Sequence, residues 1–384
     1  MNCFQDLFGR APEYLFAAPG RTELGGNHTD HQRGKALAAA VSVCCRAQAA
    51  ENSGGAIRVF SEGFGGCSVA LNELAPVPEE RGCSAALIRG VAAGFLRRGI
   101  EPRGFDAYVR SDVPSGGGLS SSAAFELLIS SILNHICNAA LSPVELAQIG
   151  REAENAFFSK PCGLMDQLAC ASGGIVGMDF INPDEPLLEK LDFSFAEHGY
   201  ALCIVHSGAD HAGLTEHYAS VTRELAAVCA VFGKKQLRDV PEGEFYDSLP
   251  LLRGKAGDRA VLRAMHVYDE NRRVDAQIKA LRRGDIHAFL ELARQSGESS
   301  WELMQNVTPE GAAFRQELAL TIALCRHILG DKGACRVHGG GFAGAVQAFV
   351  PLERLMEFSV ETEKSLGSGC CTVMDIRQTG AGLI

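Results

Sequence analysis

The chain has 384 residues and a formal net charge of −10, with 46% hydrophobic and 21% charged residues. The length predicts two domains packed as one unit, and the composition is ordinary for a soluble protein with a substantial core. The negative charge argues against a nucleic-acid backbone or an anionic membrane as the main partner, because both require a positive protein face.

Targeting signals are missing from the residues where they would be expected. The most apolar run near the start, residues 36–45, is about half as long as a membrane span needs to be. The first ten residues lack the basic region and the apolar core of a signal peptide. The 14 cysteines form no C-x-x-C pair and lie mostly in apolar segments, so we expect reduced, buried thiols. Together these features predict a cytoplasmic protein.

Apolar periodicity and turn residues predict the following elements in chain order. Strands are expected at 14–18, 36–48, 104–110, 174–180, 187–193, 199–206, 334–338, 345–350 and 371–377. Helices are expected at 84–98, 120–137, 142–158, 214–232, 258–283, 285–303 and 309–329. Helices and strands mix without regular alternation, which favours an α+β fold over a doubly wound sheet. We place the boundary between two domains, 1–195 and 196–384, near residue 195.

A glycine-rich loop links a predicted strand to a predicted helix at residues 113–124, which read VPSGGGLSSSAA. Glycines let the backbone approach an anion closely, and the free N–H groups of a helix N-terminus bind phosphate. A serine hydroxyl there can also ligate Mg²⁺. A flexible turn with a serine N-cap is the alternative interpretation of the same sequence. The usual phosphate loop, the protein-kinase motifs and the G-x-S-x-G elbow of serine hydrolases are all absent.

A dense polar run, PGRTELGGNHTDH, occupies residues 19–31 between two apolar segments. So many hydrogen-bonding side chains beside small residues suit a sugar, and Arg21 is placed to stabilise charge on a transferring phosphoryl group. A solvated hairpin loop is the alternative interpretation. The spacing of His28, Asp30 and His31 is also compatible with a metal site, although a neutral histidine bonded to a hydroxyl fits equally well.

Two later segments add candidate functional residues. Glu152 and Glu154 are two residues apart and cannot share a helix face, so at most one of them points into a site. Asp166, in the loop KPCGLMDQ, is a candidate general base or a helix N-cap. The third glycine cluster, RVHGGGFAGA at 336–345, contains G-x-G-x-x-G, but a strand rather than a helix is predicted to follow it. It therefore fits a glycine turn that closes over a ligand better than a dinucleotide fold.

Taken together, these segments resemble the three motifs of the GHMP kinases, and among them the galactokinases most closely. GRTELGGNHTDH is similar to G-R-x-N-L-I-G-E-H-T-D-Y, and PSGGGLSSSA to P-x-G-A-G-L-S-S-S-A. ACRVHGGGFAG is similar to G-x-R-x-T-G-G-G-F-G-G, and EAEN…CGLMDQ at 152–167 is also typical of galactokinases. The resemblance runs in matching order over nearly the whole chain. It implies a two-domain α+β fold with the active site in the cleft between the domains. It also implies ATP-dependent phosphorylation of the anomeric hydroxyl of galactose, giving galactose 1-phosphate.

The resemblance further implies roles for individual residues. Asp166 would face the sugar C1 hydroxyl, and Arg21 would pair with Asp166 and stabilise the transition state. Ser122 and Glu154 would ligate Mg²⁺. The triphosphate loop would comprise Gly116, Gly117, Gly118, Leu119, Ser120, Ser121 and Ser122. The sugar would be contacted by Asn27, His28, Thr29, Asp30 and Gly163, and by Tyr218 as a looser match.

Three residues of the first motif depart from the family pattern. Asn27 stands where galactokinases carry glutamate, Glu23 stands where they carry asparagine, and His31 replaces tyrosine. Asn27 keeps an acceptor oxygen but loses the charge and adds an NH₂ donor, which predicts weaker galactose binding or a derivative altered at that hydroxyl. The alternative functions are a GHMP kinase for an N-acetylhexosamine or a pentose, and a non-catalytic galactokinase-like sugar sensor. The intact GLSSSAA stretch, with Arg21 and Asp166, favours an enzyme.

Overall fold

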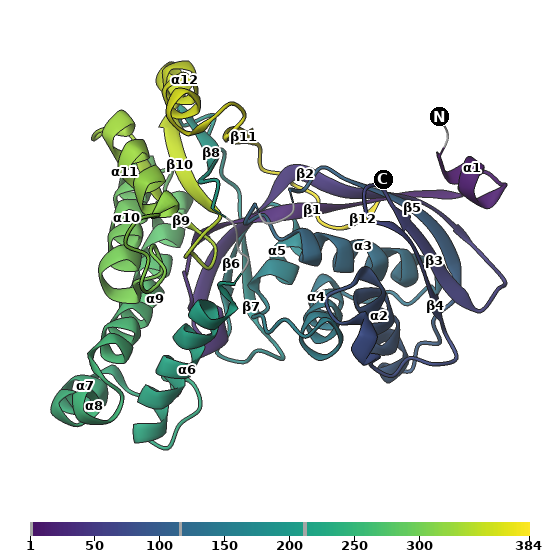
Figure 1. Ribbon diagram of the computed structural model, residues 1–384, viewed down its shortest axis with the longest axis horizontal. Helices are drawn as coiled ribbons and strands as arrows, with labels where there is room; N and C mark the ends of the chain where they lie inside the picture. Colours follow the sequence, from purple (N-terminus) through teal and green to yellow (C-terminus); the bar gives the residue numbers. More distant parts are fainter. Residues whose placement is uncertain (1–2, 115–116, 210–212) are drawn as a thin grey trace.

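The computed structural model describes residues 3–114, 117–209 and 213–384. A mixed sheet of eight strands dominates the first half of the chain (Figure 1). Its strands are β1 (Tyr14–Gly25), β2 (Lys35–Glu51), β3 (Ala56–Ser61), β4 (Gly65–Ala70), β5 (Phe105–Ser111), β6 (Ile175–Asp179), β7 (Leu187–Leu191) and β12 (Gly382–Leu383). The order is β12-β1-β2-β5-β3-β4, with β6 paired to β2 and β7 to β6. Among the strand pairs of this sheet in the described residues, β3–β5 alone is parallel.

Four helices lie on one side of this sheet (Figure 1). They are α2 (Ser84–Arg97), α3 (Ser121–Ile136), α4 (Pro143–Ala153) and α5 (Met165–Ser172). Three of them contact its strands, and the fourth, α4, packs against the other three. The central strand β2 contacts α3 and α5 and also α9 (Asp258–Arg282), so most of its residues are buried. Its residues 36–40, four alanines and Leu37, are completely buried, and the alanines let the surrounding elements approach closely. A short helix, α1 (Cys3–Phe8), precedes the sheet.

A second sheet of four strands, in the order β11-β8-β10-β9, lies in the second half of the chain. Its strands are β8 (Tyr200–His206), β9 (Ala334–His338), β10 (Ala345–Pro351) and β11 (Cys371–Met374). The helices of this half are α6 (Thr215–Val231), α7 (Glu242–Asp247), α8 (Leu249–Lys255), α9, α10 (Ile286–Ser299), α11 (Glu317–Leu329) and α12 (Leu355–Leu366). In Figure 1 the long helices α9, α10 and α11 stand beside this sheet, away from helices α2–α4.

The α+β prediction is confirmed, and most predicted elements lie within a few residues of their expected positions. The capping box is present as predicted: the Ser142 hydroxyl accepts from the Glu145 N–H, and the Glu145 carboxylate accepts from the Ser142 N–H. One prediction was wrong in a way that matters for the site. The polar run was expected to lie between strands, but β1 continues to Gly25, so Arg21 and Glu23 are strand residues. The helix expected from residue 309 begins only at Glu317.

The predicted domain boundary at 195/196 falls between β7, the last strand before it in the larger sheet, and β8, the first strand of the smaller one. The C-terminal tail then returns to the larger sheet, where Gly382 and Leu383 pair with β1. The Ala381 N–H donates to the carbonyl of Cys170 near the end of α5. A single cut in the sequence does not describe this arrangement, because the last residues of the chain complete the first sheet. Within the described residues, no helix is long and apolar enough to cross a membrane.

Candidate active site

Arg21 and Asp166 form a bidentate ion pair at the centre of the site. Arg21 Nε lies 2.7 Å from Asp166 Oδ1, and Nη2 lies 2.8 Å from Oδ2. Burial alone would raise the pKa of Asp166, but the Arg21 guanidinium and the Ser120 hydroxyl hold it below its ordinary value. The N-cap interpretation of Asp166 was wrong: Leu164 is the N-cap residue of α5, and the Asp166 side chain bonds to Arg21 and Ser120 instead.

The glycine loop lies directly beside this ion pair. The Arg21 N–H donates to the carbonyl of Leu119, and Arg21 Nη1 donates to the carbonyl of Gly118. Gly118 has φ +74°, and a Cβ atom there would lie 2.8 Å from Nδ1 of His338, so only glycine fits between the loop and β9. Ser121 begins the 16-residue helix α3, whose N-terminus faces the loop. Gly116 lies outside the described residues.

Ser122 and Glu154 come together as the motifs predicted. Ser122 Oγ donates to Glu154 Oε1 at 2.8 Å, although the two residues lie on different helical segments. Glu154 is buried, whereas Glu152 points outward and pairs with Arg97 at 2.7 Å. The two glutamates thus point in different directions, as their spacing predicts, whereas the assignment of Glu154 to an active site stays a prediction. A carboxylate and a hydroxyl are oxygen ligands of the kind that Mg²⁺ prefers.

No group of three or more His, Cys, Asp or Glu residues within the described chain is arranged to hold a metal ion. The donor set nevertheless fits Mg²⁺, which is commonly held by one or two protein oxygens together with substrate phosphates. In this structure the Lys160 ammonium lies 2.8 Å from Glu154 Oε1 and 3.5 Å from Ser122 Oγ, so a cation already faces the two oxygens.

Sequence reasoning missed three residues that contact or adjoin Glu154. Gln167 Nε2 donates to Glu154 Oε2 at 2.8 Å and to Glu126 Oε2 at 3.1 Å, and all three of these side chains are buried. Lys160 is the third residue. Spacing could have found Glu126, because it lies four residues after Ser122 on α3 and therefore shares its face. Gln167 lies inside the CGLMDQ segment, next to Asp166.

The segment after β1 brings Asp30 near the ion pair, with His28 two residues before it. Burial lowers the pKa of His28 to about 3 and that of His31 to about 4, so both rings are neutral at pH 7. The Asp30 carboxylate accepts from the N–H groups of His31 and Met165, the latter at the start of α5. Burial and the neighbouring charge of Asp166 raise the pKa of Asp30.

Gly163 is required because the Asp30 carboxylate occupies the space where a side chain would lie. A Cβ atom on Gly163 would lie 1.6 Å from Asp30 Oδ2. We expect Gly163→Ala to displace Asp30 and raise the KM for the sugar by about tenfold, at a typical overpacking cost of 1–3 kcal/mol, with little change in the KM for ATP. Steady-state kinetics with each substrate varied in turn would measure this. Gly243→Ala, where a Cβ atom would meet nothing within 4 Å, is the matched control. A parallel rise in both KM values would contradict the assignment.

The remaining predicted sugar residues have partners within the protein. The Thr29 hydroxyl lies 2.7 Å from the carbonyl of Gly26 and 2.5 Å from that of Lys35, so it shapes the loop. The Tyr218 hydroxyl donates to the carbonyl of Gly341 at 2.7 Å, in the third glycine cluster. Asn27 is completely buried. The third cluster thus contacts the 26–30 segment through the carbonyls of Gly339 and Gly340. The expectation that it closes over a ligand stays a prediction.

Glu270 of α9 anchors the backbone of this segment. Its Oε1 accepts from the N–H groups of Gly26 and Asn27 and from the Ser296 hydroxyl. Burial would raise the pKa of Glu270, but Arg273 and its other partners hold the pKa well below its ordinary value. Its stabilising contribution is therefore fully present above the unfolded-state pKa of about 4.3 and is lost as the pH falls through the folded-state pKa.

We expect Glu270→Gln to lower the free energy of unfolding by about 3 kcal/mol at pH 7, since it removes the charge from a buried, paired carboxylate. The difference from the unchanged protein should shrink as the pH falls below about 4.3. Urea unfolding of both proteins at pH 7 and pH 3.5 would measure it, with Glu353→Gln, at an exposed residue, as the control. An equal difference at both pH values would contradict the account.

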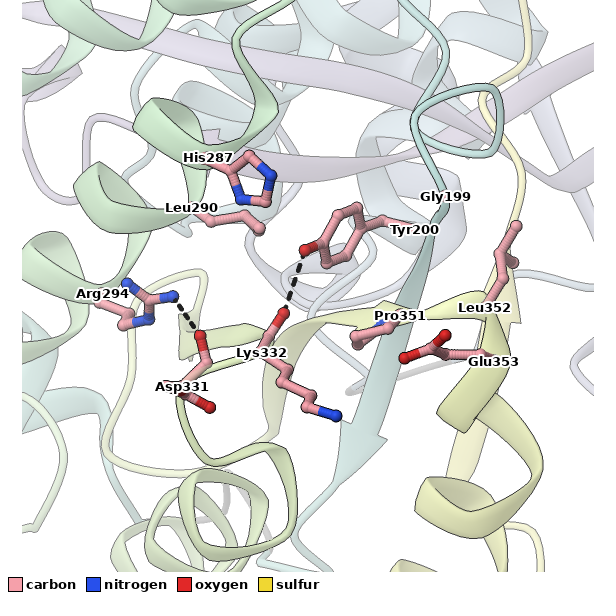
Figure 2. A pocket seen from close by; sticks show the side chains of 10 residues that line it. All are labelled: Gly199, Tyr200, His287, Leu290, Arg294, Asp331, Lys332, Pro351, Leu352 and Glu353. Carbon is pink, nitrogen blue, oxygen red and sulfur yellow. Dashed lines mark hydrogen bonds between the residues drawn. The ribbon is translucent and has the colours of Figure 1, made fainter.

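A separate hollow of about 600 Å³ lies at the outer end of the second sheet, between α10 and the start of β8 (Figure 2). None of the predicted site residues lines it. Its polar side chains hold backbone carbonyls: the Tyr200 hydroxyl donates to Lys332, and Arg294 donates to Gly333 and Asp331. These contacts hold the turn before β9 in place. The polar side chains around the hollow therefore have a structural role, and no ligand is needed to explain them.

Comparison with known proteins agrees with this geometry. The family model described as the GHMP kinases N terminal domain matches residues 86–174, and the galactokinase galactose-binding signature matches residues 2–50. Galactokinases from Glaesserella parasuis serovar 5 and Mannheimia succiniciproducens are each 30% identical, over 92% of this chain and 89% of their own. The structure of Lactococcus lactis galactokinase complexed with galactose superposes with a TM-score of 0.84 at 24% identity, covering 100% of this chain and 97% of that one. A mevalonate kinase superposes with a TM-score of 0.67 at 17% identity, covering 95% and 99%.

The fold and the phosphate-side motif are those of the GHMP class of small-molecule kinases. Within that class, the chain belongs to the galactokinase family. It is therefore a sugar kinase, and kinases of this family use ATP as the phosphoryl donor.

Proposed function

We propose that this protein transfers the γ-phosphoryl group of ATP to the anomeric hydroxyl of galactose, giving galactose 1-phosphate. The observation that carries the proposal is the bidentate Arg21–Asp166 pair at the junction of the glycine loop and the segment that holds Asp30. An ionised carboxylate fixed beside a phosphate-binding loop suits the activation of a hydroxyl for in-line attack.

In this mechanism Asp166 orients the C1 hydroxyl and accepts its proton as the O–P bond forms. Arg21 keeps Asp166 ionised at neutral pH and stabilises the negative charge that develops on the transferring group. The loop from Gly117 to Ser122, with the N-terminus of α3 behind it, supplies N–H donors for the triphosphate. Phosphoryl transfer needs mainly this positioning and charge stabilisation.

Ser122 and Glu154 would hold Mg²⁺, with Gln167 orienting the Glu154 carboxylate. When bound, the ion would supply neutralisation of the phosphate charge. Lys160 would turn away from Glu154 to make room for the ion, which its 59% exposed side chain permits.

For the sugar, Asp30 is the best-supported contact. Asp30 lies between the start of α5 and Gly163, close to Asp166. Both ring nitrogens of His28 have protein partners, since Nε2 lies 3.0 Å from the carbonyl of Gly340 and Nδ1 lies 3.2 Å from His31 Nε2. His28 would therefore contact a sugar hydroxyl only by exchanging one of these partners. Gly163 leaves room for the Asp30 carboxylate and so keeps it in place. Thr29 and Tyr218 would act indirectly, through the loops that they hold.

A coupled ADP-release assay with galactose, N-acetylgalactosamine, glucose and arabinose would test the proposal. We expect the highest kcat/KM with galactose and a 1-phosphate product, identified by ³¹P–¹H correlation NMR. A higher kcat/KM with N-acetylgalactosamine or arabinose would assign another sugar. The absence of ADP release with every sugar, in a folded protein that binds ATP, would indicate a sugar sensor.

A further inference from the structure

The Asn27 side chain has no free hydrogen-bonding group. Its Nδ2 donates to Glu23 Oε1 at 3.1 Å and to the carbonyl of Gly339 at 2.7 Å. Its Oδ1 accepts from Asn306 Nδ2 at 2.8 Å and lies 3.4 Å from Ser300 Oγ. An amide has two N–H donors and two acceptor sites, so all four are used inside the protein. These partners also fix which way the amide is oriented.

Two acceptors, the Glu23 carboxylate and the Gly339 carbonyl, face the same side of Asn27. A carboxylate at position 27 has no N–H group, so it could not donate a hydrogen bond to either acceptor and would be repelled by both. Glu23 is itself required by Arg336, which is completely buried and donates to the same Glu23 oxygen. A buried arginine needs an opposite charge, because desolvation of an unpaired charge is very costly. The amide at 27 and the carboxylate at 23 therefore depend on each other.

Asn27 also connects the two halves of the molecule. Its backbone N–H and carbonyl are bonded to Glu270 and His266 of α9, while its side chain reaches the glycine turn after β9. The next residue, His28, has a left-handed backbone conformation with φ +58°. Its Nε2 atom lies 3.0 Å from the carbonyl oxygen of Gly340. The conformation of the 26–30 segment is thus set by what Asn27 holds.

We propose that Asn27 is a positioning residue, which couples the sugar-binding segment to the glycine turn at 339–341, and that it works only with a carboxylate at position 23. This replaces the expectation that Asn27 contacts the sugar directly. The two departures from the galactokinase pattern, Glu23 and Asn27, contact each other. The family pattern has asparagine at the first position and glutamate at the second, so the amide and the carboxylate have exchanged positions in this chain. The functional part of this inference rests on the proposed sugar phosphorylation, whereas the mutual dependence of the two residues does not.

The test is a double-mutant cycle of Glu23→Asn, Asn27→Glu and the combined E23N/N27E protein. Glu23→Asn leaves Arg336 unpaired, and Asn27→Glu places two carboxylates in contact. The double variant again places one amide and one carboxylate in contact, so one negative charge remains beside Arg336, and a carboxylate at 27 accepts from Asn306 and Ser300. We expect each single change to raise the KM for galactose by about 10- to 100-fold, with the KM for ATP altered by less than about threefold. The double variant should return to within about tenfold of the starting KM.

Thermal unfolding supplies a readout that does not depend on activity. We expect the double variant to recover more than half of the summed losses in Tm of the single variants. Simple addition of the two losses would overturn the mutual dependence, whatever sugar the enzyme uses. Asn72→Asp, at an exposed asparagine, is the control and should change neither KM nor Tm.

The sugar specificity decides between positioning and direct contact. If Asn27 positions the segment, the double variant keeps the sugar ranking of the starting protein. If the ranking follows residue 27 alone, regardless of residue 23, then Asn27 contacts the sugar and the proposal is wrong. A rise in the KM for ATP equal to that for galactose would also overturn it, because a general loss of structure would explain both.

Discussion

Replacement of Asp166 by asparagine is expected to lower kcat by about 10²- to 10⁴-fold, the usual contribution of a positioned general base. An asparagine cannot take the proton of the sugar hydroxyl, and it leaves the Arg21 guanidinium with half of its bidentate contact. Some loss of thermal stability should accompany the change, since Arg21 is nearly buried. Nucleotide binding should persist, because the glycine loop is still attached to β1 through Leu119.

ADP release measures kcat, and calorimetry with a non-hydrolysable ATP analogue measures nucleotide binding. Asp112→Asn is a matched control, because Asp112 pairs with Arg46 on the surface, where ion pairs contribute little. Turnover within tenfold of the starting protein would exclude Asp166 as the proton acceptor. If Asp166→Asn also lost nucleotide binding, the role of the Arg21–Asp166 pair would be to hold the glycine loop in place and not to take part in phosphoryl transfer.

The second large effect is expected for Glu154→Gln. The change keeps the size of the side chain but removes the charge that would hold Mg²⁺ beside Ser122. We expect the Mg²⁺ concentration for half-maximal activity to rise by about 10- to 100-fold, a range measured for residues that support metal sites. Activity should recover in part at high Mg²⁺. Titration of Mn²⁺ by electron paramagnetic resonance in the presence of the ATP analogue gives a readout independent of turnover.

Glu152→Gln is the matched control, two residues earlier in the same segment. Glu152 is paired with Arg97 and Arg98 away from the site, so its loss should leave the Mg²⁺ requirement unchanged. If both substitutions raised the Mg²⁺ requirement equally, the cause would be a change in the helix that carries both residues and not the loss of a metal ligand. An unchanged Mg²⁺ requirement in Glu154→Gln would remove Glu154 from the proposed ligands.

The sequence predicted best those features that depend on local pattern. Hydrophobic periodicity located most helices and strands, and the motifs identified the residues that the fold brings together, such as Ser122 with Glu154 and Arg21 with Asp166. Arg21 was assigned to a loop because strands were expected to be apolar. Arg21 can lie on a buried strand because Asp166, 145 residues later in the sequence, pairs with its charge. The periodicity of apolar residues gives no information about such an ion pair.

Contacts made over long sequence separations were not predictable in the same way. The partners of Asn27 include Glu23, four residues away, and Asn306, 279 residues away. Only the fold reveals that the buried amide is fully used, so the sequence could note the unusual residue but not its surroundings. Glu270 was missed for the same reason, because it lies within a long helix whose pattern gives no sign that one carboxylate faces a loop of the other half.

The return of the C-terminal tail to the first sheet has a consequence for the order of synthesis. The helix that carries Asp166 ends against residues 377–381: the Gly174 N–H donates to the carbonyl of Arg377, and Gly380 packs against the carbonyl of Ala171. These neighbours are translated more than 200 residues after Asp166. A ribosome-bound chain that already contains every predicted catalytic residue but not residues 377–381 thus lacks the support of this helix, and we expect activity to appear only after those residues have left the ribosome.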